Sequence, residues 1–527
     1  MSHTESADRL PRIIFAVTVG LGSCIALLAL FVEPYFFQFY GDANSRLVQT
    51  RMIIDSTSPG LHWIGSVWLP LPQLLFLPFS LIDPLFRTGL AGFVVCMPLL
   101  GWSAVLMYRL LRDVTDEPVA AAIGALFFAL NPNMLYISMT AMTETVTLFF
   151  FIASVQQWMV WLRGPRAGRA LPLLLASLSA AAATLCRYEA WMFTAVLFVF
   201  TLVVLLRRRA PLARAGVSVA LSLLMWTGAA FWLLWNHMQF GDAFYFNHAE
   251  YYSAAWQAAH RPVRAQYYLQ FRNVLSIYSV TAAAIFGYGF LAVAAAGTAL
   301  MLRARGRAHS IALALLLLVM PFFTLLSLFR GVAEMTEWWN SRYVLLASPF
   351  VSLAVATACA WWKGRGGGTR ALVTAAAILF ALTAGLQMSL QKGNVVTVAD
   401  AAGGFYYMQT PHATAVAEHL RAQYRGGVLF CATGSGQSHR ILQPSGIPTR
   451  SLVTGLNFDT RNLDLAFVTS SYEWVVVGLA PSPDGEVIAK HWQANAALLQ
   501  SAYDEVLRND YYIVYRKSTA TRTSSGT

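Results

Sequence analysis

Charged and polar residues suited to group transfer gather in four short segments of the sequence. These segments contain Asp42, Glu144, Arg187 with Glu189, and Asn340 with Arg342 and Tyr343. A carboxylate can take a proton from an acceptor hydroxyl, or hold a divalent metal that polarises a phosphate. An arginine can bind a departing phosphate and neutralise the charge that develops on it. The residue types therefore fit transfer of a group from a lipid-phosphate carrier, with a divalent metal left as an open question.

Each candidate also has a purely structural interpretation. Asp42 could cap a helix, with Arg46 following at the i+4 position. Glu144 could stabilise the N-terminus of an apolar helix, where a negative charge is favoured. Arg187 could pair with Glu189 or extend toward the lipid headgroups. The functional interpretation gains support because the topology derived below places all four segments on one face of the membrane.

The composition indicates what must position these residues. Of the 527 residues, 57% are hydrophobic and only 12% are charged, whereas soluble domains carry about 25% charged residues. The 16 tryptophans and 21 tyrosines suit a protein that meets two membrane–water interfaces. The net charge is +12, and the basic residues lie in short clusters between apolar stretches. This distribution indicates membrane topology and argues against a nucleic-acid partner. An integral membrane protein surrounded by lipids is predicted.

About eleven apolar stretches are long enough to cross a hydrocarbon core of roughly 30 Å as helices. They cover residues 12–32, 88–111, 117–132, 142–162, 170–187, 189–206, 214–236, 274–302, 309–329, 343–362 and 370–389. The segment 67–82 is also apolar, but Pro70, Pro72 and Pro78 favour an interfacial or re-entrant piece. The predicted fold class is a polytopic α-helical membrane protein.

Basic clusters orient these spans. They occupy the short loops Arg163–Arg169, Arg207–Arg214, Arg303–Arg307 and Lys363–Arg370. Short basic loops are typical of the cytoplasmic side, so residues 1–11 are predicted to be a short cytoplasmic N-terminus. The first apolar stretch is predicted to be a retained span, because no small-residue cleavage site follows it. An odd number of spans then places the C-terminal part on the extracytoplasmic side. The protein is predicted to be a multi-pass protein of the plasma (inner) membrane.

The predicted domains follow from this topology. Residues 12–390 form the transmembrane domain, which includes a large first outer loop at 33–87 and a long outer loop at 237–273. Residues 391–517 have ordinary composition and are predicted to form an extracytoplasmic α/β domain. The tail 518–527 is rich in Ser, Thr and Gly and is predicted to be disordered.

Short apolar runs bounded by Gly, Pro and charged residues predict strands in the extracytoplasmic domain. They are Val428–Ala432, Trp474–Leu479 and Tyr511–Tyr515, and helices are predicted at 412–425 and 486–502. Only Cys431 of the five cysteines falls in this domain, so no disulfide framework is predicted.

The order of these features resembles a known family, the GT-C superfamily of membrane glycosyltransferases. The resemblance is to the branch of the protein O-mannosyltransferases and the aminoarabinose transferase of lipid A, and it covers roughly residues 10–390. It rests on Gly41-Asp42 after the first span, Trp68-Leu69-Pro70-Leu71-Pro72, Glu144 before an apolar span, the corner Cys186-Arg187-Tyr188-Glu189, and Asn340-Ser341-Arg342-Tyr343. Two departures stand out: Glu144 stands where several relatives carry Asp, and a single Asp42 replaces an Asp-Glu pair.

The resemblance implies transfer of a sugar from a polyprenyl-phosphate donor to a lipid, polysaccharide or protein acceptor of the cell envelope. Asp42 would be the catalytic carboxylate, as base or as ligand of a divalent metal. Glu144 would orient the acceptor or share that metal, and Arg187 would bind the phosphate. The substrate-binding set would also include Glu189, Asn340, Arg342 and Tyr343.

Two other classes of function remain as alternatives. A transporter or flippase for a lipid-linked substrate would place charges near the middle of the bilayer, often in paired halves of the chain. The predicted spans are almost free of ionisable residues and show no matching halves. A non-enzymatic envelope-assembly protein would not depend on Asp42 at all. The sugar, the acceptor, the oligomeric state and the role of the C-terminal domain are not specified by the sequence.

Overall fold

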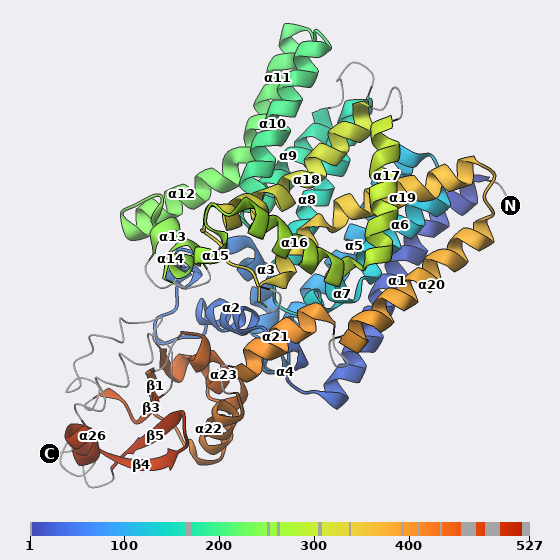
Figure 1. Cartoon of the computed structure of the whole chain (residues 1–527). Coiled ribbons are helices and arrows are strands. Elements are labelled where there is room, and N and C mark those ends of the chain that lie inside the picture. The colour runs from blue at the N-terminus through green and yellow to red at the C-terminus, as the bar shows by residue number, and fades with distance from the viewer. Residues whose placement is uncertain are drawn as a thin grey trace. The chain divides into compact units, whose positions relative to one another are not determined.

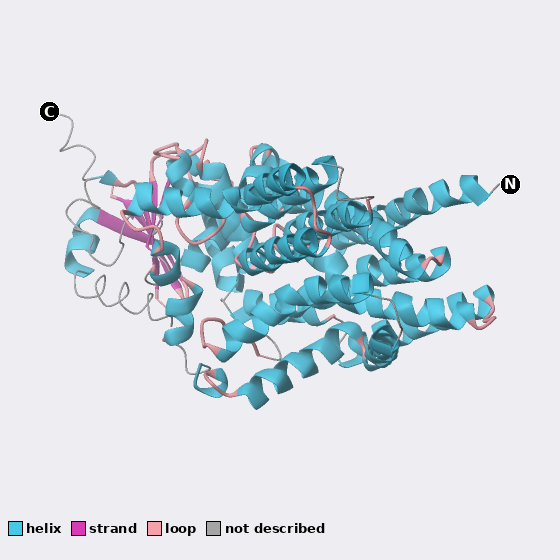
Figure 2. Cartoon of the chain, turned by 90° about the horizontal axis from the view of Figure 1, so that it is seen from above, coloured by secondary structure: helices cyan, strands magenta, loops and turns pink. Residues whose placement is uncertain are grey.

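The computed structural model describes most of the chain as helices, with strands confined to the C-terminal part (Figures 1 and 2). The described residues are 3–164, 170–249, 253–260, 264–303, 308–336, 339–390, 395–407, 410–432, 435–454, 471–479 and 496–518. The chain forms two compact units. The first comprises Met1–Glu33, Gly65–Pro72 and Phe93–Asp400, and the second comprises Pro34–Ile64, Gln73–Gly92 and Ala401–Thr527.

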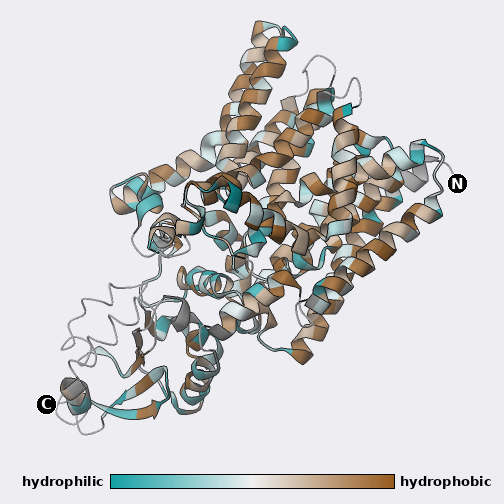
Figure 3. Cartoon of the chain, in the orientation of Figure 1, coloured by the Kyte–Doolittle hydropathy of each residue, from teal (hydrophilic) through white to brown (hydrophobic). Residues whose placement is uncertain are grey.

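Within the described residues, eight helical segments are long and apolar enough to cross a membrane. They are α1 (His3–Val32), α5 (Leu90–Thr115), α8 (Glu144–Arg163), α10 (Glu189–Arg207), the run of α11 (Leu212–Leu223), η4 (Leu224–Trp226) and α12 (Thr227–Phe240), α18 (Ala308–Phe329), the run of η5 (Ser341–Ala347) and α19 (Ser348–Gly364), and α20 (Thr369–Leu390). Hydrophobic residues, brown in Figure 3, run along these helices. The chain is a multi-pass membrane protein.

The predicted span 274–302 is broken. Its two halves, α16 (Phe271–Phe286) and α17 (Tyr288–Arg303), meet at an angle of 108°. Gly287 forms the corner with φ of 78°, and a Cβ at this position would lie 2.4 Å from Thr383 Cγ2. Both the backbone angle and the close approach require glycine. Hydrophobicity alone does not reveal such a corner, because both halves are apolar.

The two remaining predicted spans are shorter apolar helices, α6 (Pro118–Leu130) and α9 (Ala170–Thr184). All eleven predicted stretches therefore contain helix, but the described chain has eight spans by length, or nine if the bent pair counts as one. The number eleven stays a prediction. The segment 67–82 contains α3 (Pro70–Ser80), an eleven-residue helix.

Small residues let the helices of the first unit approach closely. A Cβ at Gly297 of α17 would lie 1.9 Å from the carbonyl oxygen of Ala354 in α19. On another face of α19, a Cβ at Gly124 of α6 would lie 2.9 Å from the carbonyl oxygen of Ser352. Such contacts replace the hydrophobic effect as the source of packing energy inside a bilayer. Helix α19 is therefore packed inside the bundle, and η5 at its N-terminal end is fixed with it.

Shorter elements connect the spans of the first unit. They are α7 (Pro132–Ile137), α13 (Tyr245–His248), α14 (Ala254–Ala259) and α15 (Arg264–Tyr267). Helix α21 (Val396–Tyr407) follows α20 and contributes its first residues, up to Asp400, to this unit.

The second unit contains a five-stranded sheet in the order β2-β1-β3-β5-β4. Its strands are β1 (Leu429–Ala432), β2 (Leu452–Thr454), β3 (Trp474–Gly478), β4 (Tyr503–Arg508) and β5 (Tyr512–Lys517). β1 pairs in parallel with β2 and β3, whereas β5 is antiparallel to β3 and β4. Helices α22 (Thr410–Gln423), α23 (Ser435–Ser445) and α26 (Ala496–Ala502) and the turn η6 (Thr449–Ser451) complete it.

The three predicted strands correspond to β1, β3 and β5, and the predicted helix 412–425 corresponds to α22. Residues 486–495 of the other predicted helix and residues 519–527 of the tail lie outside the described residues. β2 and β4 are additional. β4 carries Asp504, Glu505 and Arg508 at the edge of the sheet, where charged residues are common because the outer face meets water.

Segments from the region of the first outer loop also belong to the second unit. They are η1 (Phe36–Gln38), α2 (Gly41–Met52), η2 (Leu61–Ile64) and α4 (Asp83–Thr88). Helices α2 and α4 pack against α23 of the C-terminal part.

Candidate active site

A buried group of charged residues surrounds the first turn of α8. Glu144 is the first residue of this helix, and its side chain is completely buried. Nη1 of Arg187 donates to Oε1 of Glu144 at 2.9 Å. Nε of Arg342 lies 3.2 Å from the same oxygen. Two guanidinium groups from distant parts of the sequence therefore converge on one carboxylate.

Arg187 is held by several partners at once. Its Nη2 lies 2.7 Å from Oε1 of Glu189, and its Nη1 donates to Oγ1 of Thr143 at 3.2 Å. Together with Glu144, these groups fix the guanidinium plane, because Nη1 contacts Thr143 and Glu144 while Nε and Nη2 contact Glu189 on the other edge. The pairing of Arg187 with Glu189 expected from the structural interpretation is present, but the contact with Glu144 goes beyond it.

An aromatic ring lies beside both arginines. The guanidinium carbon of Arg187 is 5.3 Å from the ring centroid of Tyr343, and that of Arg342 is 5.2 Å from it. At these distances a cation is attracted to the face of the ring. Glu144, Arg187 and Arg342, together with Glu189 and Tyr343, are thus brought together as one cluster.

The remaining predicted residue of this segment, Asn340, shapes the loop. It adopts φ of 60° and ψ of 22°, a left-handed conformation that Asn tolerates better than most residues. Its Nδ2 donates to the carbonyl oxygen of Glu334 at 3.0 Å. Asn340 therefore forms the turn from which η5, carrying Arg342 and Tyr343, begins.

Asp400 is a member of this region that sequence reasoning missed. Its Oδ2 accepts hydrogen bonds from the backbone nitrogen of Ser341 at 3.1 Å and from the hydroxyl of Ser341 at 2.8 Å. Asp400 is only 3% exposed. The signal in the sequence is an acidic residue in the middle of the apolar run Thr397–Ala402, a position where burial demands a partner. Asp400 anchors the residue directly before Arg342.

A hydrogen-bonded chain fixes the corner that carries Arg187. The hydroxyl of Tyr188 donates to the carbonyl oxygen of Val67 at 2.8 Å and accepts from Nε1 of Trp232 at 3.0 Å. The ring of Tyr188 is stacked on Phe246, with centroids 4.9 Å apart. Three separate segments of the first unit therefore meet at this corner.

Asp42 belongs to the second unit. It lies in the first turn of α2, where the N-cap residue is Tyr40 and Tyr40 makes no side-chain cap bond. The interpretation of Asp42 as the cap residue is therefore not what the structure shows, although a negative charge is favoured in a first turn. The shared site of Asp42 with Glu144 and Arg187 stays a prediction.

The cluster balances two carboxylates, Glu144 and Glu189, against two guanidinium groups, Arg187 and Arg342. No group of three His, Cys, Asp or Glu side chains in the described part of the chain is placed to hold a metal ion. Both carboxylates of the cluster, Glu144 and Glu189, are paired with arginine, and the two guanidinium groups would repel a divalent cation. An incoming phosphate would instead meet two cations held in place.

Comparison with known proteins identifies the fold. No family model matches the chain, and no curated protein matches it. A crystal structure of ArnT from Cupriavidus metallidurans bound to undecaprenyl phosphate is similar at 13% identity and a TM-score of 0.58, covering 96% of this chain and 99% of that chain. The apo state of ArnT gives 14% identity and a TM-score of 0.54, covering 95% and 98%.

AglB, an oligosaccharyltransferase from Archaeoglobus fulgidus, is also similar, with 10% identity and coverage of 97% of this chain and 74% of that chain. Its TM-score is 0.47. ArnT is an aminoarabinose transferase of the GT-C superfamily. The likeness to ArnT shows the fold: the chain shares the fold of this enzyme, in agreement with the resemblance found in the sequence.

Proposed function

We propose that the protein is a membrane glycosyltransferase that moves a sugar from a polyprenyl-phosphate donor to a cell-envelope acceptor on the outer face of the plasma membrane. The observation that carries the proposal is the convergence of Arg187 and Arg342 on the buried Glu144. The donor class is supported by the ArnT structure, which is bound to undecaprenyl phosphate. The acceptor is a lipid, a polysaccharide or a protein of the envelope.

The two arginines serve the leaving group. When the bond between the sugar C1 and the phosphate oxygen breaks, the polyprenyl phosphate takes the electron pair and gains negative charge. Arg187 and Arg342, already oriented by Glu144 and Tyr343, neutralise that charge without rearranging. Preorganised cations of this kind stabilise the transition state more than the ground state.

Glu144 has a second role through its other oxygen. Oε2 of Glu144 is buried and has no hydrogen-bond partner among the described residues. Leaving a buried acceptor without a partner costs about 1–3 kcal/mol, so a donor from the substrate would be favoured there. A hydroxyl of the acceptor or of the sugar can supply it. Glu144 thus holds the arginines with one oxygen and orients a substrate with the other.

Asp42 is proposed as the general base. The acceptor oxygen forms the new bond to C1 of the sugar, and its proton passes to the Asp42 carboxylate. Asp42 lies in the first turn of α2, where a negative charge is favoured by the helix dipole. A divalent metal remains open at Asp42, and no step of this mechanism depends on one.

The test uses the purified full-length protein in lipid nanodiscs. It is incubated with a panel of polyprenyl-phosphate sugars and with envelope lipids, polysaccharide or peptide, and free polyprenyl phosphate is measured by mass spectrometry. Release with at least one donor, together with a glycosylated acceptor, is expected. Absence of release across the panel would overturn the proposal. Transfer of intact donor between the leaflets of a vesicle, without release, would favour the alternative of a flippase.

A further inference from the structure

We propose that the C-terminal domain is part of the catalytic apparatus, because its helix α23 holds helix α2 and thereby positions Asp42. The inference rests on the proposed function, in which Asp42 is the base. Helix α2 and the C-terminal residues from Ala401 onward belong to one compact unit, and α2 packs directly against α23 (Figure 1). Asp42 therefore lies in the same compact unit as the C-terminal domain.

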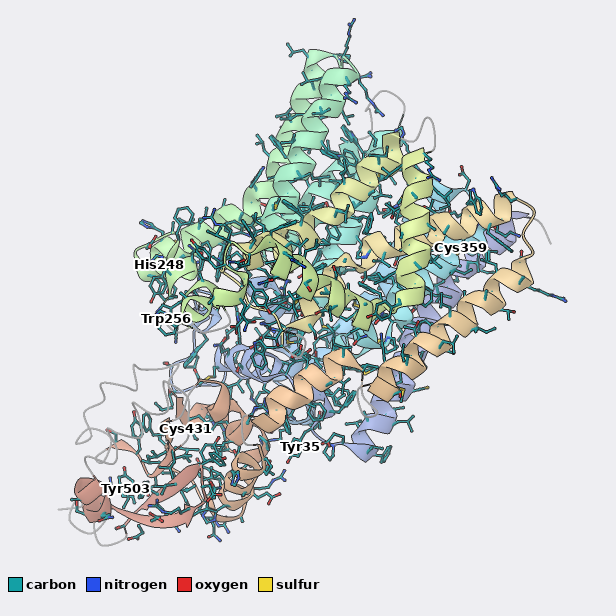
Figure 4. All side chains as sticks on the ribbon, in the orientation of Figure 1. Tyr35, His248, Trp256, Cys359, Cys431 and Tyr503 are labelled. Atoms are coloured by element: carbon teal, nitrogen blue, oxygen red, sulfur yellow. The ribbon has the colours of Figure 1, made fainter. Side chains whose placement is uncertain are left out.

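A buried cation of α23 fixes the chain just before Asp42. Arg440 is 4% exposed, and its Nη2 donates to the carbonyl oxygen of Phe39 at 3.4 Å. Its guanidinium carbon lies 4.5 Å from the ring centroid of Phe405. The ring of Phe405 packs in turn against Phe39 at 5.0 Å and against Tyr35, labelled in Figure 4, at 5.8 Å. C-terminal side chains thus surround the segment that leads into α2.

A second anchor lies just beyond the other end of α2. The hydroxyl of Thr449 in η6 donates to Oδ2 of Asp55 at 2.7 Å. The same oxygen accepts from Nε of Arg51, in the last turn of α2, at 3.1 Å. Arg51 also pairs with Asp83 of α4 at 2.6 Å, and its hydrogen bond lowers the pKa of the Asp83 carboxyl, which stays ionised at neutral pH.

Helix α4 adds a third set of contacts to the same part of the domain. Nη2 of Arg87 donates to the carbonyl oxygen of Gly446, directly after α23, at 3.1 Å. Nε2 of Gln443, a buried residue of α23, donates to the carbonyl oxygen of Phe86. Because Arg51 joins α2 to α4, these contacts and the Thr449 anchor act on one connected network.

A twelve-residue helix fixed at both ends leaves its first-turn side chains little freedom to move. Misplacing a catalytic group by about 1 Å can reduce a rate by about a hundredfold. The position of Asp42 is therefore sensitive to contacts made by residues about 400 positions away in the sequence.

The decisive variants are Thr449→Val, which keeps the size of the side chain and removes the hydroxyl, and Arg440→Gln. Each is expected to lower kcat by roughly tenfold to a hundredfold. Binding of polyprenyl phosphate is expected to change less than about twofold, because the proposed phosphate-binding arginines belong to the other unit. Thr449→Ser, which keeps the hydroxyl, should restore kcat. Glu505→Gln is the matched control, since it breaks an exposed ion pair with Arg508 in the same domain without touching α2.

Hydrogen exchange of the α2 amides in the full-length protein provides the readout that does not depend on catalysis. Loss of protection in Thr449→Val and Arg440→Gln, together with the fall in kcat, is the expected result. Unchanged protection, or lost protection with normal kcat, would overturn the inference. A wild-type protein with no transferase activity would refute the proposed function, whereas the exchange data would still show whether α23 holds α2.

Discussion

At the scale of single residues, the cluster around Glu144 meets two demands: it offsets the cost of burying charge, and it holds two arginines in position for a substrate. Burying an isolated carboxylate is very costly, and removing one partner of a buried ion pair costs about 3–5 kcal/mol. Glu144 offsets part of this cost by sharing Oε1 between Arg187 and Arg342, while its Oε2 has no hydrogen-bond partner among the described residues. The same arrangement keeps both arginines in place before a substrate arrives. Stability and preorganisation therefore come from the same contacts.

Replacing Asp42 by Asn tests its role as the base. The substitution keeps the shape of the side chain and removes the charge that accepts the proton. Turnover is expected to fall by at least about a hundredfold, the usual scale for losing a general base. Donor binding should change little, and the helix should lose at most about 1 kcal/mol of charge–dipole stabilisation. The checks are single-turnover transfer, polyprenyl-phosphate binding and thermal unfolding, and near-normal transfer would remove Asp42 from the mechanism.

Replacing Arg187 by Lys should give the opposite pattern. A lysine keeps one positive charge but lacks the planar fork that contacts Glu144, Glu189 and Thr143 together. Affinity for polyprenyl phosphate is expected to fall by about tenfold or more, because the charge is no longer held in position. Isothermal titration with the lipid in nanodiscs measures this. Unchanged affinity would show that Arg187 serves only the structure of the corner.

At the scale of elements, η5 connects the charged cluster to the rest of the first unit. Ser341 begins this turn, and its backbone nitrogen and hydroxyl are both bound by Asp400. A capping carboxylate at the start of a helical turn satisfies a donor that would otherwise be buried without a partner. Arg342 follows directly, so its direction toward Glu144 depends on this anchor.

Replacing Asp400 by Ala should therefore affect donor use as well as stability. The backbone nitrogen of Ser341 would lose its acceptor, at a cost of about 1–3 kcal/mol. The KM for the donor is expected to rise severalfold, and Asp400→Asn should recover part of it because one oxygen acceptor remains. Thr357→Val is the control, since the Thr357 hydroxyl donates to the carbonyl oxygen of Leu353 within α19. A lower melting temperature with an unchanged KM would limit Asp400 to a structural role.

The elements differ in how well the sequence predicts them. Apolar stretches such as 309–329 and 370–389 predict helices correctly, because a bilayer permits little else for such a run. The corner at Gly287 and the edge strand β4 were missed, since one depends on contact with Thr383 and the other has charges on its exposed face. The members of the cluster were predicted from residue type and order. Their mutual distances, and the role of Asp400, depend on tertiary packing that no local pattern records.

At the scale of the whole molecule, the sequence predicts a transmembrane domain and a C-terminal domain, and the structure adds contacts of the first-outer-loop region with the C-terminal part. Sequence reasoning assigned residues 33–87 to an outer loop of the transmembrane domain. In the structure, Pro34–Ile64 and Gln73–Gly92 share a compact unit with Ala401–Thr527. The contact of Thr449 with Asp55 joins residues 394 positions apart. Sequence periodicity and composition carry no information about pairing over such a separation. The role proposed for the C-terminal domain therefore rests on the three-dimensional arrangement.

Membrane topology is the whole-molecule prediction that every assignment of an outer-face reaction requires. Cysteines are introduced singly as Gly364→Cys, at the C-terminal end of α19 between Lys363 and Arg365, and as Ser501→Cys, in α26 of the C-terminal domain; both sites are exposed. The background carries Cys24→Ser, because Cys24 is exposed whereas the other four cysteines are buried.

In intact cells an impermeant thiol reagent is expected to label position 501 and not position 364, since short basic loops stay in the cytoplasm. After the cells are opened, position 364 should become reactive, which shows that the thiol itself is accessible. The reverse pattern would place the C-terminal domain inside and remove the outer-face reaction, because the domain that carries Asp42 in its compact unit would then meet the cytoplasm.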